Sequence, residues 1–378
     1  MPSKDYDVIV VGAGPAGSMA ALYAARSGAS TALIDKRKLP RDKLCGGGVN
    51  AWVIRKLSIP ENIIERTMKQ AQVVAGNKKL PLVSWPNSLA WRMVLRDRFD
   101  YHLTKMAAEA GATLIDSTAI ESAELDKKGT VCGVRAKNNI HLRCSVVIGC
   151  DGVTSTIAKT AGFWSKWFNN NVRNWLSKCA YCAEAQYKLP DTEIRARIGD
   201  TSFIFYERDL MGYHWIFPKK GLLTVGTGCA TTYSKKKPAS YFNDFVKSNT
   251  IAKEILKDAK ILDRLKGAYV PFSGTFKPSY GDGVLVAGDS AGMVGAVTGE
   301  GIYFAVRAGM AAGEIAAKAA LSGNTSSKYL SRYEKKWQTE IGSHLDAQVR
   351  FLGKTQNPLI AMGLYTAYTL KHQKELYP

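Results

Sequence analysis

The sequence predicts an α/β fold, in which a domain of parallel strands and helices carries an inserted antiparallel β-sheet and is followed by a C-terminal helical segment. Three observations predict it. Residues 6–35 read as a buried strand, a glycine-rich turn, a helix and a second strand. Two further apolar runs, VVIG and VLVA, read as buried strands of the same parallel sheet. Residues 202–230 read as antiparallel strands joined by short turns.

The first stretch has the spacing of a dinucleotide-binding turn. Gly12, Gly14 and Gly17 form G-x-G-x-x-G. The first glycine allows the tight turn, the second lets the backbone approach a pyrophosphate, and the third lets helix and strand pack closely. Asp35 ends the second strand, where an acidic side chain binds ribose hydroxyl groups. The pattern predicts a Rossmann-type domain for NAD or FAD. Three neighbours are expected at the same cofactor: Pro15, Ala16 and Lys36.

Composition narrows the classes of function. The chain has 378 residues, of which 46% are hydrophobic, so it can bury a large core. It contains no run of 18 uncharged apolar residues, and a membrane-spanning helix is not expected. The seven scattered cysteines favour a reducing, cytoplasmic setting. The net charge of +20 indicates an anionic partner. No nucleic-acid-binding module accompanies that charge, so a phosphorylated substrate or an acidic lipid surface is expected instead.

Two more motifs decide between the dinucleotides. The run VVIGC leads into Asp151-Gly152, and the run VLVA leads into Gly288-Asp289. In this order and spacing the motifs resemble FAD-binding flavoproteins of the p-hydroxybenzoate hydroxylase type. The resemblance implies that Asp289 binds near the ribityl-phosphate part of FAD. It also implies that a helix N-terminus points at the pyrimidine side of the flavin, where reduced flavin carries negative charge. The residues implied at the cofactor are Asp151, Gly152, Gly288, Asp289, Gly299, Gly301 and Ile302.

Four segments narrow the resemblance: KLCGGG, RDRFDYHLTKMAAEAGA, GYHWIFPKKGLLTVGTGCA and GEGIYFAVRAG. They are similar to the geranylgeranyl reductase family, which uses FAD to saturate isoprenoid double bonds, in archaeal membrane lipids among other substrates. The resemblance implies that Arg96 contacts the flavin cofactor and that the backbone near Ala119 meets its adenine end. Ala296 stands where the family usually has proline, and Lys159 where related hydroxylases commonly have arginine. The reductant therefore stays open between NADPH and reduced ferredoxin.

The loop RDKLCGGGV places one cysteine before three glycines. Ordering glycine costs backbone entropy, so such a run indicates a close backbone approach. In the fold that the resemblance implies, this loop passes beside the isoalloxazine ring. We therefore expect the glycines at 46 to 48 to let the backbone press against the ring and to leave space for a substrate chain, with Gly46 and Gly47 at the cofactor; a side chain at Gly46 would occupy space the ring needs. Cys45 is expected at the redox face; the alternative is a small buried apolar residue.

An aromatic strand follows in YHWIFP. Alternation puts Tyr213, Trp215 and Phe217 on one face and His214 and Ile216 on the other. Such a stripe is ordinarily sheet core. The resemblance instead implies that Tyr213 and Trp215 line a tunnel for an isoprenoid chain, where aromatic rings would stabilise positive charge on the alkene. His214 is then structural, and the segment KKG that follows reads as a turn.

Other signals carry less weight. Cys179 and Cys182 form C-x-x-C in a strand-like run, but no second pair accompanies them, so a metal or redox role is not favoured. The five histidines show no ligand spacing, and no metal site is expected.

These assignments divide the chain into three regions. The FAD-binding domain is expected at residues 1–55, 90–165 and 265–325, and the substrate domain at 56–89 and 166–264. A helical region follows at 326–378, with Ser327 as its N-cap. Within it, the uncharged run 357–370 is too short to span a bilayer. It reads either as a helix packed over the substrate sheet or as an interfacial segment on anionic lipids, which would make the protein peripheral to a membrane.

The sequence thus predicts an FAD-dependent reductase for C=C bonds of geranylgeranyl chains, in membrane lipids or their diphosphate precursors. Its candidate catalytic residues are Cys45, Tyr213 and Trp215. An isolated alkene is not polarised, so such a site must stabilise cationic character and exclude water. Two alternatives stay open: a single-component flavin monooxygenase or halogenase for an aromatic substrate, and a non-enzymatic FAD-binding scaffold at a membrane.

Overall fold

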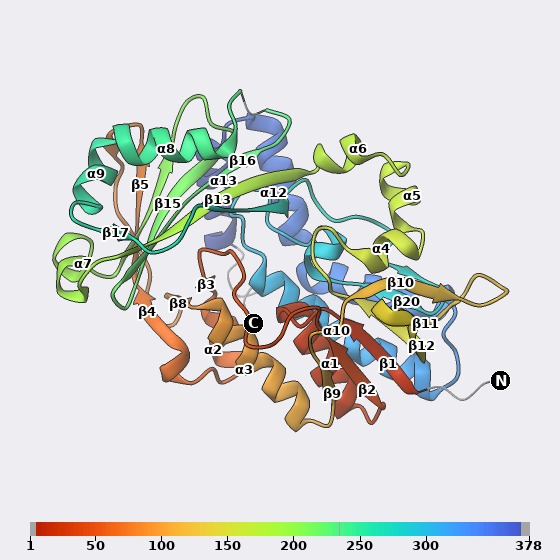
Figure 1. The fold of residues 1–378 in the computed structure, drawn as a ribbon. Coiled ribbons are helices and arrows are strands. Elements are labelled where there is room, and N and C mark those ends of the chain that lie inside the picture. Colours follow the sequence, from red (N-terminus) through yellow and green to blue (C-terminus); the bar gives the residue numbers. More distant parts are fainter. Residues whose placement is uncertain (1–4, 234, 372–378) are drawn as a thin grey trace.

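A computed structural model describes residues 5–233 and 235–371. Its first sheet contains the parallel strands predicted from the sequence (Figure 1). Strands β9, β2, β1, β12 and β20 lie side by side in parallel, and Val10 pairs with Leu33 of β2 and Ile148 of β12. The hairpin β10–β11 and the short β19 pair antiparallel at the edges. The bounds are β1 Tyr6–Val11, β2 Thr31–Ile34, β9 Thr113–Ile115, β10 Ile120–Leu125, β11 Val131–Ala136, β12 Ile140–Gly149, β19 Tyr280–Gly281 and β20 Val284–Val286.

Two helices rich in small residues pack together against this sheet. They are α1 (Pro15–Arg26) and α10 (Ile302–Leu321), and α3 (Arg96–Glu109) packs on α1 as well. A Cβ at Gly309 would come within 2.2 Å of the carbonyl oxygen of Ala16, so the two helix backbones touch. This close packing brings the N-termini of α1 and α10 to the same side of the sheet, where Pro15 and Ile302 border one cavity.

The second sheet is the inserted one. Its strands follow the order β17-β13-β16-β15-β14-β5-β6, with β18 beside β13 and β7 beside β5. One pair departs from the expected antiparallel arrangement, because β5 runs parallel to β14. The bounds are β5 Gln70–Ala75, β6 Lys78–Lys79, β7 Val83–Ser84, β13 Cys179–Lys188, β14 Thr201–Tyr206, β15 Gly212–Lys219, β16 Leu222–Ala230, β17 Lys260–Ile261 and β18 Lys266–Pro271. Strand β18 therefore belongs to the inserted sheet, although it lies within residues 265–325, which were expected in the FAD-binding domain.

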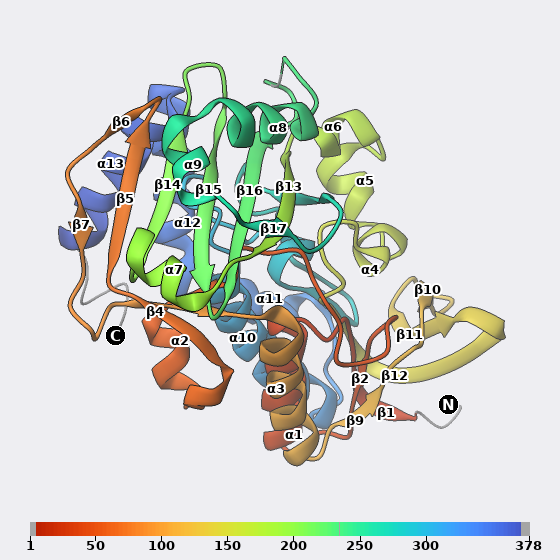
Figure 2. The same ribbon diagram turned by 60° about the vertical axis from the view of Figure 1, so that its left-hand side comes forward.

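The two faces of this larger sheet have different neighbours (Figure 2). Helices α8 (Pro238–Ser248) and α9 (Thr250–Ile255) cover one face, where Phe242 and Phe245 join a buried cluster with Phe205 and Ile216. The opposite face looks toward the parallel sheet and toward α12 (Ser343–Thr355) and α13 (Pro358–Lys371). The space on that side holds the cavity described below.

A small sheet and several short helices complete the chain. The small sheet has the order β3-β8-β4. Strand β3 follows the loop after β2, and β4 leads into β5 of the larger sheet. Its bounds are β3 Gly48–Val49, β4 Ile64–Met68 and β8 Trp91–Val94. The remaining helices are α2 Ala51–Lys56, α4 Thr156–Thr160, α5 Phe163–Phe168, α6 Val172–Leu176, α7 Asp191–Arg197 and α11 Ser327–Trp337.

The C-terminal region is helical, as expected. The N-cap of α11 is Ser326 and not Ser327, because the Ser326 side chain accepts the N–H of Tyr329. Helix α13 covers nearly all of the uncharged run, while the basic residues beyond 371 lie outside the described part of the chain. Among the described residues, no helix combines the length and apolar character needed to cross a bilayer.

Candidate active site

A cavity of about 460 Å³ lies between the larger sheet and the parallel sheet. Its walls come from distant parts of the chain: residues 43–48, strands β5, β13 and β15, the segment 294–302, and α13. Most lining side chains are apolar or aromatic, and a few polar groups converge among them. Pockets of this composition typically bind apolar ligands, which their few polar groups orient.

The glycine turn is shaped by packing at two positions and open at the third. A Cβ at Gly12 would lie 2.3 Å from the carbonyl oxygen of Cys150, and one at Gly17 would lie 1.8 Å from that of Gly12. At Gly14 the nearest atom would be the Arg41 guanidinium, 3.8 Å away. Helix α1 begins there without a side-chain cap. The turn therefore presents free space, helix N–H groups and an arginine, which suits a phosphate group.

Asp35 is held in place by this turn. Its carboxylate accepts the N–H of Ala13 at 2.9 Å and pairs with Arg41 at 3.1 Å. Arg41 also bonds Asp100, which binds Arg96 through both carboxylate oxygens. Burial opposes the charge of Arg96, but Asp100 and the neighbouring Cys45 outweigh it and hold the pKa of Arg96 above its ordinary value. A fixed cation thus borders the cavity beside the cysteine.

Other residues expected at the cofactor are spread around this turn. Pro15 borders the cavity and Ala16 packs against Gly288, whereas the side chain of Lys36 is exposed. The carbonyl of Ala119 accepts the N–H of Lys137.

Asp151 and Gly152 take a structural place. The carboxylate of Asp151 accepts the N–H groups of Thr156 and Ile157 and the hydroxyl of Ser155, so it holds the start of α4. Burial raises its pKa, and these hydrogen bonds oppose the rise. Gly152 turns with φ +86° and donates its N–H to Ser290. Both oxygens of Asp151 are thus engaged within the turn, and its contact with the cofactor stays a prediction.

Residues from the segment Gly288 to Ile302 form another wall of the cavity. Asp289 pairs with Lys43 at 3.5 Å, and Gly288 turns with φ +67°. Gly299 has φ +68°, and a Cβ there would lie 2.6 Å from the Tyr213 hydroxyl. Gly301 precedes α10, which, like α1, has no side-chain cap. Two uncapped helix N-termini therefore face one cavity, as a bound anion or electron-rich ring requires.

The glycines of the loop 45–48 have a different purpose from the expected one. A Cβ at Gly46 would lie 2.8 Å from the Phe217 ring, and one at Gly47, where φ is +79°, would lie 2.3 Å from the carbonyl oxygen of Val94. A Cβ at Gly48 would meet Trp91 at 3.3 Å. The glycines let the loop pack against the protein, and a side chain at Gly46 would first meet Phe217; the expected contact of Gly46 with the flavin ring stays a prediction.

Two charged residues that the sequence reading missed lie beneath this loop. Glu184 of β13 accepts the N–H of Cys45 at 3.3 Å, and Lys219 of β15 donates to the carbonyl of Gly46 at 3.0 Å. Burial raises the pKa of Glu184 to about 7, against the opposing effect of Lys219. Burial lowers the pKa of Lys219, and Glu184 opposes that. The loop carrying Cys45 is thus held at two backbone atoms by a buried acid and a buried base.

The aromatic strand lies as its alternation predicted. Tyr213, Trp215 and Phe217 border the cavity, while Ile216 belongs to the cluster under α8. His214 is fully buried on that second face and stacks on Phe245. The Tyr213 hydroxyl donates to the carbonyl of Thr298 at 2.6 Å. This bond joins the larger sheet to the loop before α10, so one aromatic wall serves both halves of the site.

A third missed residue is Glu300. It borders the cavity and is 8% exposed. Burial raises its pKa to about 8, and a hydrogen bond to Asn50 opposes the rise. Local sequence gives no signal for it, because a glutamate between two glycines ordinarily reads as a solvated turn residue.

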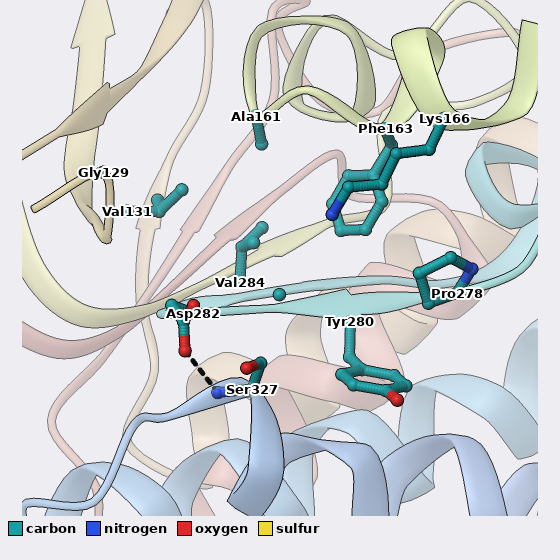
Figure 3. A pocket seen from close by; sticks show the side chains of 11 residues that line it. Gly129, Val131, Ala161, Phe163, Lys166, Pro278, Tyr280, Asp282, Val284 and Ser327 are labelled. Carbon is teal, nitrogen blue, oxygen red and sulfur yellow. Dashed lines mark hydrogen bonds between the residues drawn. The ribbon is translucent and has the colours of Figure 1, made fainter.

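Neither the C-x-x-C pair nor a second cavity is a better candidate for the active site. Cys179 and Cys182 lie three apart on β13 and face opposite sides: Cys179 packs with Trp175, and Cys182 borders the main cavity. The second cavity, of about 320 Å³, lies between α5 and the β19–β20 hairpin (Figure 3). Its acid, Asp282, accepts the N–H of Ser327 at the start of α11 (Figure 3). The main cavity is therefore the candidate active site.

The residues around the main cavity fit FAD. An uncapped helix, the open side of Gly14 and Arg41 offer a phosphate site beside Asp35, and the second uncapped helix borders the space beside Cys45 and Arg96. A model of the FAD binding domain family matches residues 5–195. The protein is an FAD-binding flavoprotein, and its cofactor is FAD.

Similar proteins define the family further. A digeranylgeranylglycerophospholipid reductase from Methanocaldococcus jannaschii is 32% identical over 351 residues, which cover 92% of this chain and 85% of that protein. A second, named digeranylgeranylglycerophospholipid reductase 2, from Methanothermobacter thermautotrophicus, is 32% identical over 354 residues, covering 92% of this chain and 86% of that protein. The chain therefore belongs to the digeranylgeranylglycerophospholipid reductase family.

Solved structures agree with this placement. A geranylgeranyl bacteriochlorophyll reductase-like protein from Thermoplasma acidophilum superposes with a TM-score of 0.81 at 25% identity, covering 95% of this chain and 87% of that one. A flavin-dependent brominase superposes with a TM-score of 0.74 at 18% identity, covering 98% of this chain and 92% of that one. The brominase shares the fold, which hosts more than one flavin chemistry.

Proposed function

We propose that this flavoprotein saturates C=C bonds in geranylgeranyl chains of membrane lipids or of their diphosphate precursors. One observation carries the proposal: the cavity beside Cys45, which reaches α13, is lined mostly by aromatic and apolar side chains. A prenyl chain offers no hydrogen bonds, so such walls suit it better than they suit a polar substrate. The named relatives act on lipids of this class.

The proposed roles follow from the contacts around the cavity. The Gly14 turn, Arg41 and Asp35 would hold the adenosine and pyrophosphate part of FAD, and the start of α10 would face the flavin. Reduced FAD supplies hydride to one carbon of the double bond. Tyr213 and Trp215 would hold the chain and stabilise positive charge on the alkene through their ring faces. Cys45 would lie at the reacting bond.

The proposal is tested on the FAD-bound protein without oxygen. The flavin is reduced with dithionite, and geranylgeranyl diphosphate or a geranylgeranylated phospholipid is added. Product masses should rise by two hydrogens for each bond reduced. A parallel reaction under air with NADPH, halide and an aromatic substrate tests the monooxygenase and halogenase alternative. If the prenyl chain stays unchanged while the aromatic compound gains oxygen or halogen, the reductase proposal is wrong.

We also propose that α13 rests on an anionic membrane surface. Ile360 and Leu364 are 53% and 42% exposed on this helix, whereas Ala361 and Tyr365 are buried against Val297. Met362 and Tyr365 border the cavity. The outer face is apolar and the inner face touches the cavity, so a lipid would have only a short distance to move between bilayer and cavity. The net charge of +20 would draw the protein to acidic headgroups.

A further inference from the structure

Glu300 is an acid in an unusual position. It lies in the turn that leads into α10, at the wall of the main cavity, and only 8% of its surface is exposed. Its Oε1 is buried and has no hydrogen-bond partner among residues 5–233 and 235–371. A buried polar atom without a partner costs free energy. The carboxyl group at this position therefore needs an explanation other than stability.

The surroundings of Glu300 favour the protonated, uncharged form of its carboxyl group. Asn50 accepts the N–H of Trp52 with its Oδ1, so its amide NH₂ is the group that donates to Glu300. The phenols of Tyr303, from α10, and Tyr365, from α13, lie close by, and burial raises the pKa of Tyr303 to about 12 and that of Tyr365 still higher. Burial likewise raises the pKa of Glu300 to about 8, opposed by Asn50. At pH 7 the carboxyl group therefore keeps its proton.

The other acids near the cavity are less suited to give up a proton. Burial raises the pKa of Cys182 to about 12, and that of Tyr213 far above its ordinary value. The Tyr213 proton is also engaged with the carbonyl of Thr298. Glu184, whose pKa of about 7 also lies near the working pH, is excluded by its position: it is not among the residues that line the cavity, and its Oε1 accepts the N–H of Cys45 under the loop. A general acid works best when its pKa lies near the working pH.

We propose that Glu300 is the proton donor of the reduction, a proposal that rests on the proposed function. The π bond of the substrate breaks; one carbon receives hydride from the reduced flavin, and the other receives the proton from the Glu300 carboxyl group. Two C–H bonds form, the flavin is oxidised by two electrons, and Glu300 becomes a carboxylate. That carboxylate then takes a proton from solvent.

Asn50 is a positioning residue for this step. Its amide donates to the carboxyl group, and it holds the start of α2 with its other end. The hydrogen bond stabilises the carboxylate left after proton transfer, and it orients the carboxyl group between α2 and α10.

The first test reads the proton directly. Infrared spectra of the purified, FAD-bound protein are recorded from pH 5 to 9 for the wild type and for Glu300→Gln. The wild-type-minus-variant difference should contain the carbonyl stretch of a protonated carboxylic acid at pH 6, and this band should disappear with a midpoint near pH 8. Glu314→Gln is the matched control, because Glu314 lies on α10, the helix that follows Glu300, but pairs with Lys318 and Lys336. A Glu300 carboxyl group already ionised at pH 6 overturns the proposal.

The second test reads the reaction. Single-turnover oxidation of the reduced flavin by a geranylgeranylated substrate should slow by about 100-fold or more in Glu300→Gln, while FAD affinity stays unchanged. Glu300→Asp should keep part of the rate, and Glu314→Gln all of it. If wild type and Glu300→Gln reduce the chain equally fast, this proposal is wrong and the proposed function stands. If the wild type reduces no prenyl chain, the proposed function fails and takes this proposal with it.

Discussion

The two faces of the larger sheet are built from the same strands and differ in what they pack against. On the face under α8, the rings of His214 and Phe245 stack with centroids 4.2 Å apart, and His214 pairs with Thr227 at 2.6 Å. On the other face, Tyr213 and Trp215 border the cavity. Neighbouring residues of β15 thus belong to a closed core and to an open wall.

The cause of the difference lies on the adjacent strand. Trp215 stands opposite Gly226 in the register of β15 and β16, and Tyr213 stands opposite Gly228. A Cβ at Gly226 would lie 2.1 Å from the Trp215 ring, so the indole lies directly over that glycine. The Trp215 ring is thus laid against the sheet, which leaves room above it. The closed face therefore packs into a core, and the open face is the one where the proposed substrate would bind.

The largest expected effect on stability comes from truncating one aromatic side chain on each face of the sheet. Phe245→Ala should lower the free energy of unfolding by about 3–5 kcal/mol, because a fully buried ring leaves a cavity. Trp215→Ala should cost less, since one side of its ring already borders a cavity. It should instead lower prenyl-chain reduction. Denaturant titration and turnover assays on both variants check this, and equal losses of stability would contradict the contrast between the faces.

The next effect concerns the acid on the open side. The pKa of Glu300 is raised to about 8, so its contribution to stability is present at acid pH and is lost as the pH rises toward 8. Relative to Glu300→Gln, the free energy of unfolding of the wild type should therefore fall by about 3 kcal/mol between pH 5 and pH 8. Denaturant titrations at a series of pH values measure the difference. A difference that does not change with pH would mean that Glu300 is not a buried acid.

A third variant pair tests the loop over the open face. Gly46→Val should lower the free energy of unfolding by about 1–3 kcal/mol, because its Cβ would meet the Phe217 ring. Gly14→Ala should keep stability, since the nearest atom to its Cβ is 3.8 Å away, but it should weaken FAD binding at the turn. Thermal unfolding and flavin fluorescence titration separate the two outcomes. A stable Gly46→Val protein would remove the packing reason for the glycines.

Cys45→Ser is expected to act on rate alone. The loop is held through the backbone N–H of residue 45 and the carbonyl of Gly46, which the substitution keeps, and a serine Oγ can accept the Gly47 N–H that the Cys45 Sγ now accepts at 3.4 Å. FAD affinity and stability should stay the same, while prenyl-chain reduction falls by about tenfold, equivalent to 1.4 kcal/mol. Full turnover by this variant would return the thiol to a small buried residue with no part in the reaction.

The smallest effect concerns the outer face of α13. The double variant Ile360→Asp/Leu364→Asp should reduce cosedimentation with anionic vesicles several-fold at low salt, less than tenfold and thus below about 1.4 kcal/mol. Ile261→Asp/Leu262→Asp, which alters exposed apolar residues at and just after β17, is the matched control and should bind like the wild type. Equal binding by all three proteins would place α13 among ordinary surface helices.

The parts predicted well were those with local causes. The spacing of Gly12, Gly14 and Gly17 and the place of Asp35 follow from a turn of a few residues, and the structure has that turn. Alternation along β15 also gave the correct faces. The alternation extends to Lys219, which lies on the same face as Phe217. Lys219 was missed because KKG was interpreted as a turn.

The parts that sequence reading missed have distant causes. Glu184 and Glu300 are acids whose burial comes from other segments, the loop 45–47 and Asn50 respectively. Charged residues are mostly exposed, so nothing local marked them as buried. The packing of Gly46 was missed for the same reason, since its neighbour Phe217 lies far along the chain. Tertiary contacts decide such positions.

The walls of the cavity have a consequence for biosynthesis. They include Cys45, close to the start of the chain, and Tyr365 of α13, the last helix described. On the ribosome the dinucleotide turn emerges early, but the hollow stays open on one side until α13 has been synthesised. During that interval the cavity lacks one wall. A nascent chain stalled before residue 358 would therefore expose to chaperones the apolar lining that α13 covers, Val297 included, before the site can hold a lipid.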